Sequence, residues 1–302
     1  MAERQADRLS PAGHEQANAA GQGGPRAGGP ERPGRGRVGG LRPYAVVARM
    51  HVRAQTAYRG SFAIELVASV GVTISGICEL YVVFANVSAL GGLTLRAALL
   101  VFALGHVSFS LADLFFGHLD TLPTYLRSGA FDAFLLRPLP VLPQLVSAEL
   151  SLRRLGRTAA GSLVAAAVLA RIGIRWTPAG VGLVALTVLC GAAIFAALFT
   201  TAAAVQFWLV DGAEVTASFV YGGQYAAQFP ASIYPGPLRV LFTFVVPSAF
   251  VAYLPAMTLL GRTAPGVPQW IGWCTPLAAA GAWAIALLGW RAGLRHYTGT
   301  GS

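Results

Sequence analysis

Ionisable side chains inside apolar stretches are the residues of this sequence that are best placed to do chemistry. His106, Asp113 and His118 lie near the end of one such stretch, and Asp120 follows two residues later. His106 and Asp113 are seven residues apart, so they share one face of a helix. Imidazole and carboxylate groups bind divalent metals, but this spacing matches no strong ligand pattern. An integral membrane enzyme that uses His106, Asp113 and His118 is therefore an alternative hypothesis, and no metal site is expected.

A second set of ionisable residues lies in the preceding apolar stretch. Glu65 and Glu79 are fourteen residues apart, close to four helical turns, and Ser69, Val72 and Gly76 lie on the same face between them. Such a stripe is costly in lipid, so we expect it to face other helices or a partner subunit. Acids within the membrane also suggest a proton-coupled secondary transporter that uses Glu65 and Glu79. The chain shows no convincing inverted repeat to support that alternative.

The basic residues are all arginine, and this excludes several kinds of active site. The chain has 22 basic residues and no lysine, so it contains neither a P-loop lysine nor a lysine that forms Schiff bases. Cys78, Cys190 and Cys274 are scattered, which argues against a disulfide scaffold. We expect no cofactor in this chain, and a nucleotide that drives it must be bound by another polypeptide.

The composition is typical of a membrane protein. Of 302 residues, 55% are hydrophobic and 11% are charged, whereas soluble domains carry about 25% charge. The mean hydropathy is +0.60. We therefore expect an all-α integral membrane protein, because helices satisfy every backbone hydrogen bond within the bilayer.

The N-terminal region differs from the rest. Residues 1–41 are rich in Gly, Pro and Arg, which predicts a disordered cytosolic tail. The arginines are not interleaved with aromatic residues, so we expect no nucleic-acid partner. Residues 42–59 carry Arg42, Arg49 and Arg53 on one face, which predicts an amphipathic helix at the membrane surface.

The apolar stretches predict six transmembrane helices within residues 42–297, followed by a short tail at 298–302. The spans are about 61–85, 95–116, 158–172, 178–208, 213–230 and 269–290. Residues 1–59, the segment 117–157 and the C-terminal end hold ten, five and two of the 22 arginines. Positive charge is enriched on the cytosolic side, so both termini and the segment 117–157 are expected there.

Two assignments remain open for the proline-rich region near the end of the chain. We favour 213–230 as the fifth crossing, with 238–260 as a broken, re-entrant hairpin on the outer side. The alternative makes 213–230 a surface helix on the inner side and 238–260 the crossing. Prolines interrupt helices, and such breaks are tolerated in a membrane only against protein or water. The predicted breaks are at Pro230, Pro235, Pro247 and Pro255.

Two motifs carry a resemblance to a known family. One is RSGAFDAFLLRPLPVLPQL, from Arg127 to Leu145, and the other runs from Phe229 to Arg262. With these motifs, residues 42–297 resemble the permease subunits of ATP-binding-cassette exporters of the type-2 class, in particular a bacterial subfamily. The matching residues of the first motif are Gly129, Asp132, Leu135, Leu136, Arg137 and Pro138, and those of the second are Pro230, Tyr234, Arg239, Pro247 and Pro255.

The resemblance implies an architecture and partners. It implies six spans, an N-terminal amphipathic elbow helix, a cytosolic coupling helix between spans two and three, and re-entrant outer helices between spans five and six. It also implies that two permease subunits, identical or paralogous, work with two cytosolic ATPase subunits. The expected location is the plasma membrane of a bacterium, in contact with lipid.

The residues of the first motif fit such a coupling helix. Gly129 can end one helical piece, and Pro138 can terminate the next. The expected contacts with the ATPase are an apolar face and two charges, formed by Phe131, Phe134, Leu135, Asp132 and Arg137.

The leading hypothesis is a non-catalytic permease subunit of an ATP-driven exporter, with ATP hydrolysis in a separate chain. A largely apolar path with a few polar groups suits a hydrophobic or amphipathic substrate, drug-like or lipid-like. The residues expected to line this path are Glu79, Ser75, Tyr221, Gln224, Tyr225 and Gln228.

Overall fold

The computed structural model describes residues 59–148, 152–174, 176–209, 214, 217–264 and 266–299. The chain divides into two units, residues 1–40 and 41–302, and all described residues belong to the second unit. The predicted tail 1–41 and, apart from Arg59, the predicted surface helix 42–59 lie outside the described residues.

Five helices of at least twenty residues form the main body of the described part. They are α2 (Arg59–Asn86), α3 (Leu95–Phe116), α7 (Leu152–Arg171), α8 (Pro178–Val205) and α13 (Thr275–His296). The described residues form no strand beyond a single bridge between Leu90 and Leu93, so the expected all-α class is confirmed for this part of the chain.

The ends of these helices follow from local sequence signals. Thr177 caps α8, because its Oγ1 accepts a hydrogen bond from the Gly180 N–H at 3.1 Å and Pro178 takes the first helical position. The predicted last span, 269–290, matches the start of the candidate span Gln269–His296 and ends six residues earlier. This span begins as the 3-10 helix η6 (Gln269–Cys274) and continues as α13 to His296.

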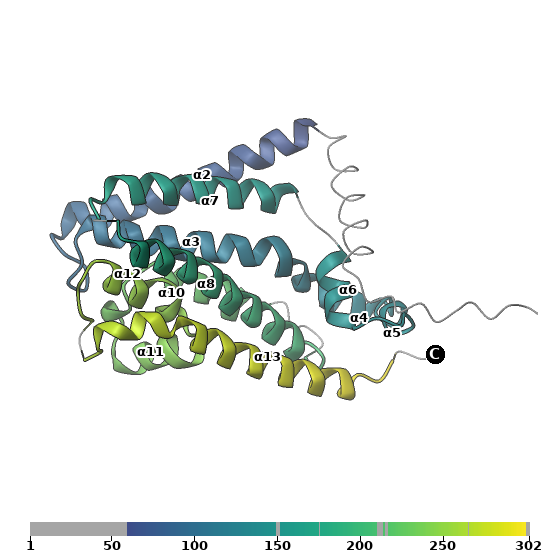
Figure 1. Cartoon of the computed structure of the whole chain (residues 1–302). Coiled ribbons are helices and arrows are strands. Elements are labelled where there is room, and N and C mark those ends of the chain that lie inside the picture. The colour runs from purple at the N-terminus through teal and green to yellow at the C-terminus, as the bar shows by residue number, and fades with distance from the viewer. Residues whose placement is uncertain are drawn as a thin grey trace, which may run out of the picture. The chain divides into compact units, whose positions relative to one another are not determined.

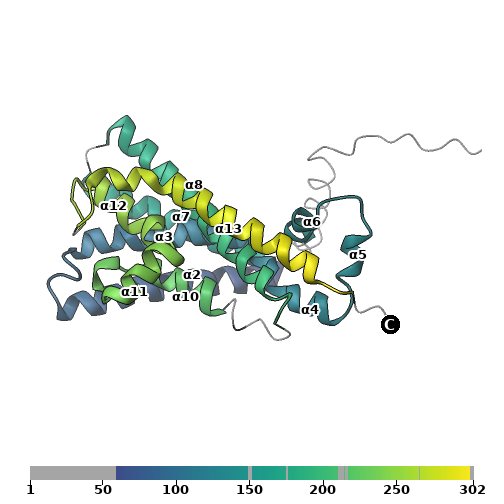
Figure 2. The same cartoon turned by 90° about the horizontal axis from the view of Figure 1, so that it is seen from below.

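The long helices pack side by side in a fixed order. α13 packs on α8, α8 on α3, α3 on α7, and α7 on α2 (Figure 1). The short helices α4 to α6 lie at the end of the row where α13 ends, and α11 and α12 lie at the opposite end (Figures 1 and 2).

Hydropathy identifies four candidate membrane spans among the described residues. They are Leu66–Asn86, Leu95–Arg127, Pro178–Val205 and Gln269–His296. The chain is therefore a multi-pass membrane protein. α7 falls outside this set, since four arginines lower its hydropathy, although its 20 residues rise roughly 30 Å, enough to cross the hydrocarbon core.

The proline-rich region folds into short helical pieces that pack on α3 and α8. The pieces are η2 (Ala217–Tyr221), α10 (Gly222–Ala227), η3 (Ala231–Ile233), α11 (Gly236–Val240), η4 (Leu241–Val245), η5 (Ala249–Tyr253) and α12 (Leu254–Leu259). η2, η4 and η5 are π-helices, in which each turn holds more residues than an α-helical turn.

The predicted breaks at prolines are found at three of the four positions. Pro230 and Pro235 lie between helical pieces, and Pro247 separates η4 from η5. Pro255 does not break the chain, because it occupies the first turn of α12 directly after the π-helix η5. A proline is tolerated in a first turn, where its missing N–H has no intrahelical partner to lose.

The fifth crossing remains a prediction. The described helix 217–227 rises only about 16 Å, roughly half of the hydrocarbon core. Residues 210–213 and 215–216 lie outside the described part of the chain.

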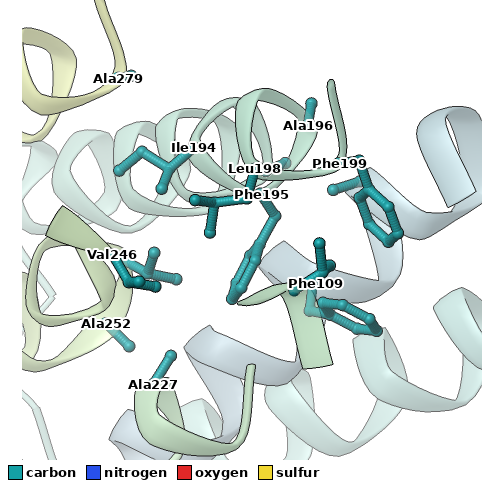
Figure 3. Close-up of a cluster of buried hydrophobic side chains, with 14 of the residues drawn as sticks. Phe109, Ile194, Phe195, Ala196, Leu198, Phe199, Ala227, Val246, Ala252 and Ala279 are labelled. Carbon is teal, nitrogen blue, oxygen red and sulfur yellow. The ribbon is translucent and has the colours of Figure 1, made fainter. Parts of the chain in front are cut away.

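An aromatic cluster anchors the proline-rich region to the long helices (Figure 3). Phe109 of α3 packs edge-on against Phe195 of α8, with ring centroids 5.2 Å apart, and the Phe199 ring of α8 lies 5.9 Å from it. Val246 and Ala227 complete this buried cluster. Each aromatic pair contributes about 0.5–1.5 kcal/mol beyond the area that it buries.

A glycine allows α7 to approach α3 closely. A Cβ built on Gly161 would lie 2.8 Å from Cδ2 of His106, whose side chain is buried and stacked on the Phe102 ring. Any side chain at residue 161 therefore has to displace a packed ring.

Gly161→Ala is expected to lower stability by about 1–3 kcal/mol, because overpacking forces the His106 ring out of place. Gly182→Ala on α8 is the matched control, since no described atom lies within 4 Å of a Cβ at that position. The control is expected to be neutral or stabilising, because alanine favours helices over glycine. Thermal unfolding of both variants in detergent checks this, and equal midpoints for the two would contradict it.

Candidate functional site

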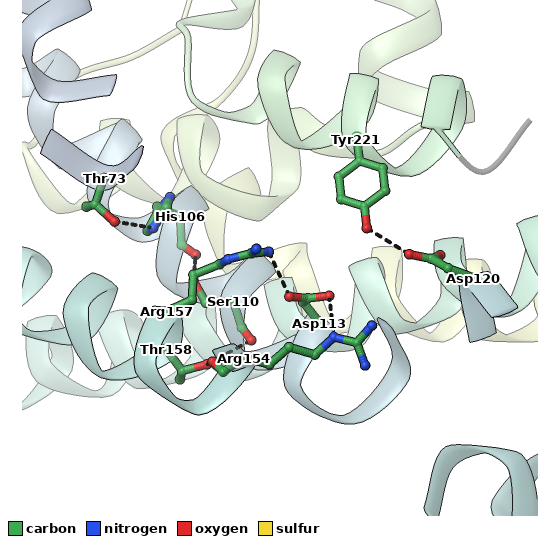
Figure 4. Close-up of polar contacts among 9 residues, drawn as sticks. All are labelled: Thr73, His106, Ser110, Asp113, Asp120, Arg154, Arg157, Thr158 and Tyr221. Carbon is green, nitrogen blue, oxygen red and sulfur yellow. Dashed lines mark hydrogen bonds and ion pairs between the residues drawn. The ribbon is translucent and has the colours of Figure 1, made fainter. Parts of the chain in front are cut away.

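A buried ion pair joins α3 to α7 (Figure 4). Asp113 of α3 is 2% exposed and is contacted by two arginines of α7. Arg154 Nε lies 3.3 Å from Oδ1, and Arg157 donates a hydrogen bond from a terminal guanidinium nitrogen to Oδ2 at 2.9 Å. The two arginines are three residues apart, so both point to the same face of α7. The cluster carries one acid and two bases, so it retains a net positive charge.

The polar contacts continue along the same helices toward α2. The Thr73 hydroxyl of α2 lies 3.2 Å from Nε2 of His106, and Thr158 of α7 donates to the carbonyl oxygen of Ser110 at 3.0 Å. These groups lie in a row between α2, α3 and α7, as Figure 4 shows. Each of these side chains makes at least one hydrogen bond inside the protein, whereas Nδ1 of His106 is buried and has no partner among the described residues.

The structure separates the residues of the enzyme hypothesis. His106 faces Thr73, Asp113 faces the two arginines, and His118 lies 3.1 Å from the Tyr125 hydroxyl. Within the described residues, no group of three or more His, Cys, Asp or Glu side chains converges on one point. His106, Asp113 and His118 therefore do not converge in the described part of the chain, and the enzyme alternative remains a hypothesis.

Two tyrosines of the proline-rich region make carboxylate contacts with other helices. The Tyr221 hydroxyl donates to Asp120 at 2.7 Å, and the Tyr225 hydroxyl donates to Glu79 of α2 at 2.6 Å. The tyrosines are four residues apart, about one helical turn, so both lie along one side of the segment. This segment is therefore tied to α2 and to the residues that directly follow α3.

Most of the residues expected to line a path are exposed on α2 or on the segment that carries Tyr221 and Tyr225. Ser75, Glu79, Tyr221 and Tyr225 are exposed, and Gln224 is partly exposed. Gln228 differs from the expectation, because it is buried within the chain with 8% exposure. The last residue of α10 precedes it, and the turn toward Pro230 brings its side chain inside.

The expected acidic stripe on α2 is only partly buried. Ser69 is buried, whereas Val72 and Glu79 are exposed, so the stripe does not face the chain's own helices along its whole length. Thr73 and Leu80 face inward instead. The side chain of Glu65 lies outside the described part, so its role in the proton-coupling alternative remains a hypothesis.

The segment after α3 forms four short helices at one end of the bundle. They are the 3-10 helix η1 (Gly117–Thr121), α4 (Leu122–Arg127), α5 (Asp132–Leu135) and α6 (Val141–Ala148). Gly129, with φ of 71°, turns the chain between α4 and α5. This left-handed conformation favours glycine.

Phe131 anchors this segment to the bundle, which differs from the expectation that it would bind a partner. It is fully buried, and its ring packs against Tyr297, Phe207 and Phe134 at centroid distances of 4.9, 5.5 and 6.4 Å. Phe207 follows α8 and Tyr297 follows α13. Burial therefore removes Phe131 from any docking surface and connects α5 to the ends of two long helices.

Asp132 is also engaged within the chain. Its Oδ1 accepts a hydrogen bond of 3.0 Å from the Tyr297 hydroxyl. Gln144 of α6 holds the other side of the segment, since its Nε2 donates to the carbonyl oxygens of Phe134 and Leu139 at 3.1 and 2.8 Å. These bonds fix the loop on which the exposed residues lie.

Four consecutive exposed residues of the segment form a tip, which we define as residues 135–138. Leu136 is 87% exposed and Leu135 47%, and Arg137 and Pro138 are exposed beside them. The Arg137 guanidinium lies over the Phe134 ring, 5.7 Å from its centroid, a cation–π arrangement. The tip is thus a small apolar surface with one positive charge, next to residues that contact the end of the bundle.

The fold and these features define a helical membrane protein with a structured segment projecting from one end of its bundle. Residues 70–301 match the family described as ABC-2 family transporter protein. The chain therefore belongs to this family, whose members are the membrane components of transporters. Searches of curated proteins and of solved structures give no match.

Asp113→Asn is expected to destabilise the protein by about 1–3 kcal/mol, because it removes the buried counter-charge of two arginines whose side chains are only 13% and 28% exposed. In a double-mutant cycle with Arg157→Gln, we expect a coupling energy of about 1–3 kcal/mol. Unfolding in detergent measures these energies. The exposed Arg291 on α13 provides the control, and coupling of Arg291→Gln to Asp113→Asn as strong as that of Arg157→Gln would refute the assignment.

Tyr297→Phe is expected to loosen residues 129–138, because it removes the hydrogen bond to Asp132 and keeps the ring. A loss of about 1 kcal/mol corresponds to roughly fivefold faster amide exchange in this segment. Hydrogen–deuterium exchange measures it. Tyr234→Phe should leave the segment unchanged, because Tyr234 lies two residues before α11, which is at the opposite end of the bundle. Unaltered exchange in Tyr297→Phe would show that the bond does not hold the loop.

Proposed function

We propose that this chain is the non-catalytic permease subunit of an ATP-driven exporter, and that a separate cytosolic ATPase of the ATP-binding-cassette type hydrolyses the nucleotide. Membership of the ABC-2 family supports the transport role. The observation that carries the proposed coupling is the exposed tip, residues 135–138, on a loop that Phe131, Asp132 and Gln144 hold from within. A rigid loop with exposed apolar residues suits docking into a groove of a motor protein.

The proposed topology has six crossings with both termini and the tip in the cytosol of a bacterium, at its plasma membrane. Positive charge supports this orientation, since the segment 117–157 contains five arginines. α7 is proposed as the third crossing and 213–230 as the fifth, with 238–260 on the outer side. The interruption at Pro247 supports a re-entrant hairpin in that region.

The working unit is proposed to contain a second permease subunit. Much of α2 is unpartnered within the chain, and Ile64, Val67 and Val82 are 65–73% exposed. Two copies that face each other across α2 and α10 would enclose a path between them. Ser75, Glu79, Tyr221, Gln224 and Tyr225 are proposed to line it, because four of them are exposed and Gln224 is partly so.

The proposed substrate is hydrophobic or amphipathic. An apolar groove of about 650 Å³ lies between α8, α13 and the proline-rich region, with Phe219, Phe250 and Leu277 in its wall. Its size is within the range of small-molecule sites. Such a surface favours a drug-like or lipid-like molecule over a sugar or an ion.

The proposal is tested by charging the tip. Leu136→Asp, which places a charge on the most exposed tip residue, is expected to abolish ATPase docking. The N-terminally tagged full chain is purified from the membranes of its own organism, and bound nucleotide-binding polypeptides are photolabelled with an azido-ATP. Wild type should retain a labelled partner and its ATP hydrolysis, and Leu136→Asp should lose both at least tenfold.

Val87→Asp is the control, because Val87 is 40% exposed and directly follows α2, which ends at the opposite end of the bundle. It should retain the labelled partner. A wild-type chain that brings down no such partner, or a Leu136→Asp chain that retains it fully, would overturn the proposal.

A further inference from the structure

A second groove lies between α2, α3 and α7, at the end of the bundle opposite the tip. Its volume is about 380 Å³, within the range of small-molecule sites. Aliphatic side chains of all three helices form its wall, among them Ile77, Leu99, Val164 and Val168. The groove is separate from the apolar groove beside α13 and shares no lining residue with it.

Two arginines lie in this groove. Arg96 is in the first turn of α3 and Arg171 is the last residue of α7, and both are exposed. Neither forms an ion pair with another described residue. Guanidinium groups match the geometry of phosphate oxygens, so the charged end of the groove is complementary to a phosphate group.

The location of the groove restricts its occupant. α2 and α3 contain candidate membrane spans, and the aliphatic wall continues from the arginines into these spans. Tyr81 borders the groove near the same end, where aromatic side chains commonly meet lipid headgroups. An occupant that reaches both the arginines and this wall needs an anionic head and an apolar tail.

We propose that this groove binds one anionic phospholipid from the bilayer, with its phosphate at Arg96 and Arg171 and an acyl chain along Ile77, Leu99 and Val168. The site is independent of the ATPase partner and of the substrate path. The lipid would contact α2, α3 and α7 at the end of the bundle opposite the Asp113 ion pair.

The first test compares a residue of α7 that lines the groove with a neighbouring residue of α7 that does not. Ala167 lines the groove and Ala166, beside it, does not, although both are exposed. Native mass spectrometry of the detergent-purified full chain, titrated with phosphatidylglycerol, measures binding. Ala167→Trp should fill the groove and weaken binding at least tenfold, whereas Ala166→Trp should bind as wild type does. Equal binding by both variants would overturn the proposal.

The second test concerns charge. Each arginine is expected to contribute about fivefold to phosphatidylglycerol affinity at low ionic strength, so Arg96→Gln with Arg171→Gln should weaken it about 25-fold. Affinity for phosphatidylcholine with the same acyl chains should change several-fold less, because its choline cation offsets the charge of the phosphate that both lipids carry. Arg262→Gln, at another exposed arginine outside the groove, is the control and should bind normally.

The third test distinguishes a lipid from a free phosphate. Glycerol phosphate at the same concentration should not displace phosphatidylglycerol, because it lacks the acyl chain that the wall contacts. Displacement would assign the site to a small anion and overturn the lipid proposal. Equal wild-type affinities for phosphatidylglycerol and phosphatidylcholine would overturn it as well.

Discussion

The interaction between Asp113 and the two arginines of α7 is the constraint on which the described bundle depends. α7 carries four arginines and is too polar to meet the hydropathy expected of a span, yet it packs against both α2 and α3. Charges cannot be left unpaired in hydrocarbon, so a helix of this composition needs an acid on its neighbour. Asp113 supplies that acid, and Gly161 allows the backbones to come close enough for the remaining contacts to form.

Much of the helical architecture could be predicted from the sequence, because a bilayer leaves a chain few options. Apolar stretches must form helices, and this argument located α3 at 95–116 and the start of α8 at Pro178. The arginine distribution likewise suggested which end carries the segment 117–157. These features depend on hydropathy and charge averaged over many residues, and such averages do not depend on which side chains are in contact.

The partners of individual side chains could not be predicted in the same way. Asp113 and Arg157 are 44 residues apart, and only the packing of α3 on α7 brings them together. Phe131 and Phe134 are both aromatic and close in sequence, so periodicity gave no means to tell that the first is buried. Similarly, a proline such as Pro255 is expected to break a helix. In the structure a π-helix, which the sequence pattern did not predict, precedes it, and Pro255 lies in the first turn of α12.

The burial of Phe131 fixes one point of the protruding loop against the ends of two long helices. Its ring is wedged between the residues that follow α8 and α13, and the exposed Leu136 lies a few residues away on the outside. A force applied to Leu136 would therefore reach α8 and α13 before it reaches α2. A displacement of the loop would therefore move α8 and α13 first, and α7 and α2 would move through their contacts with α3.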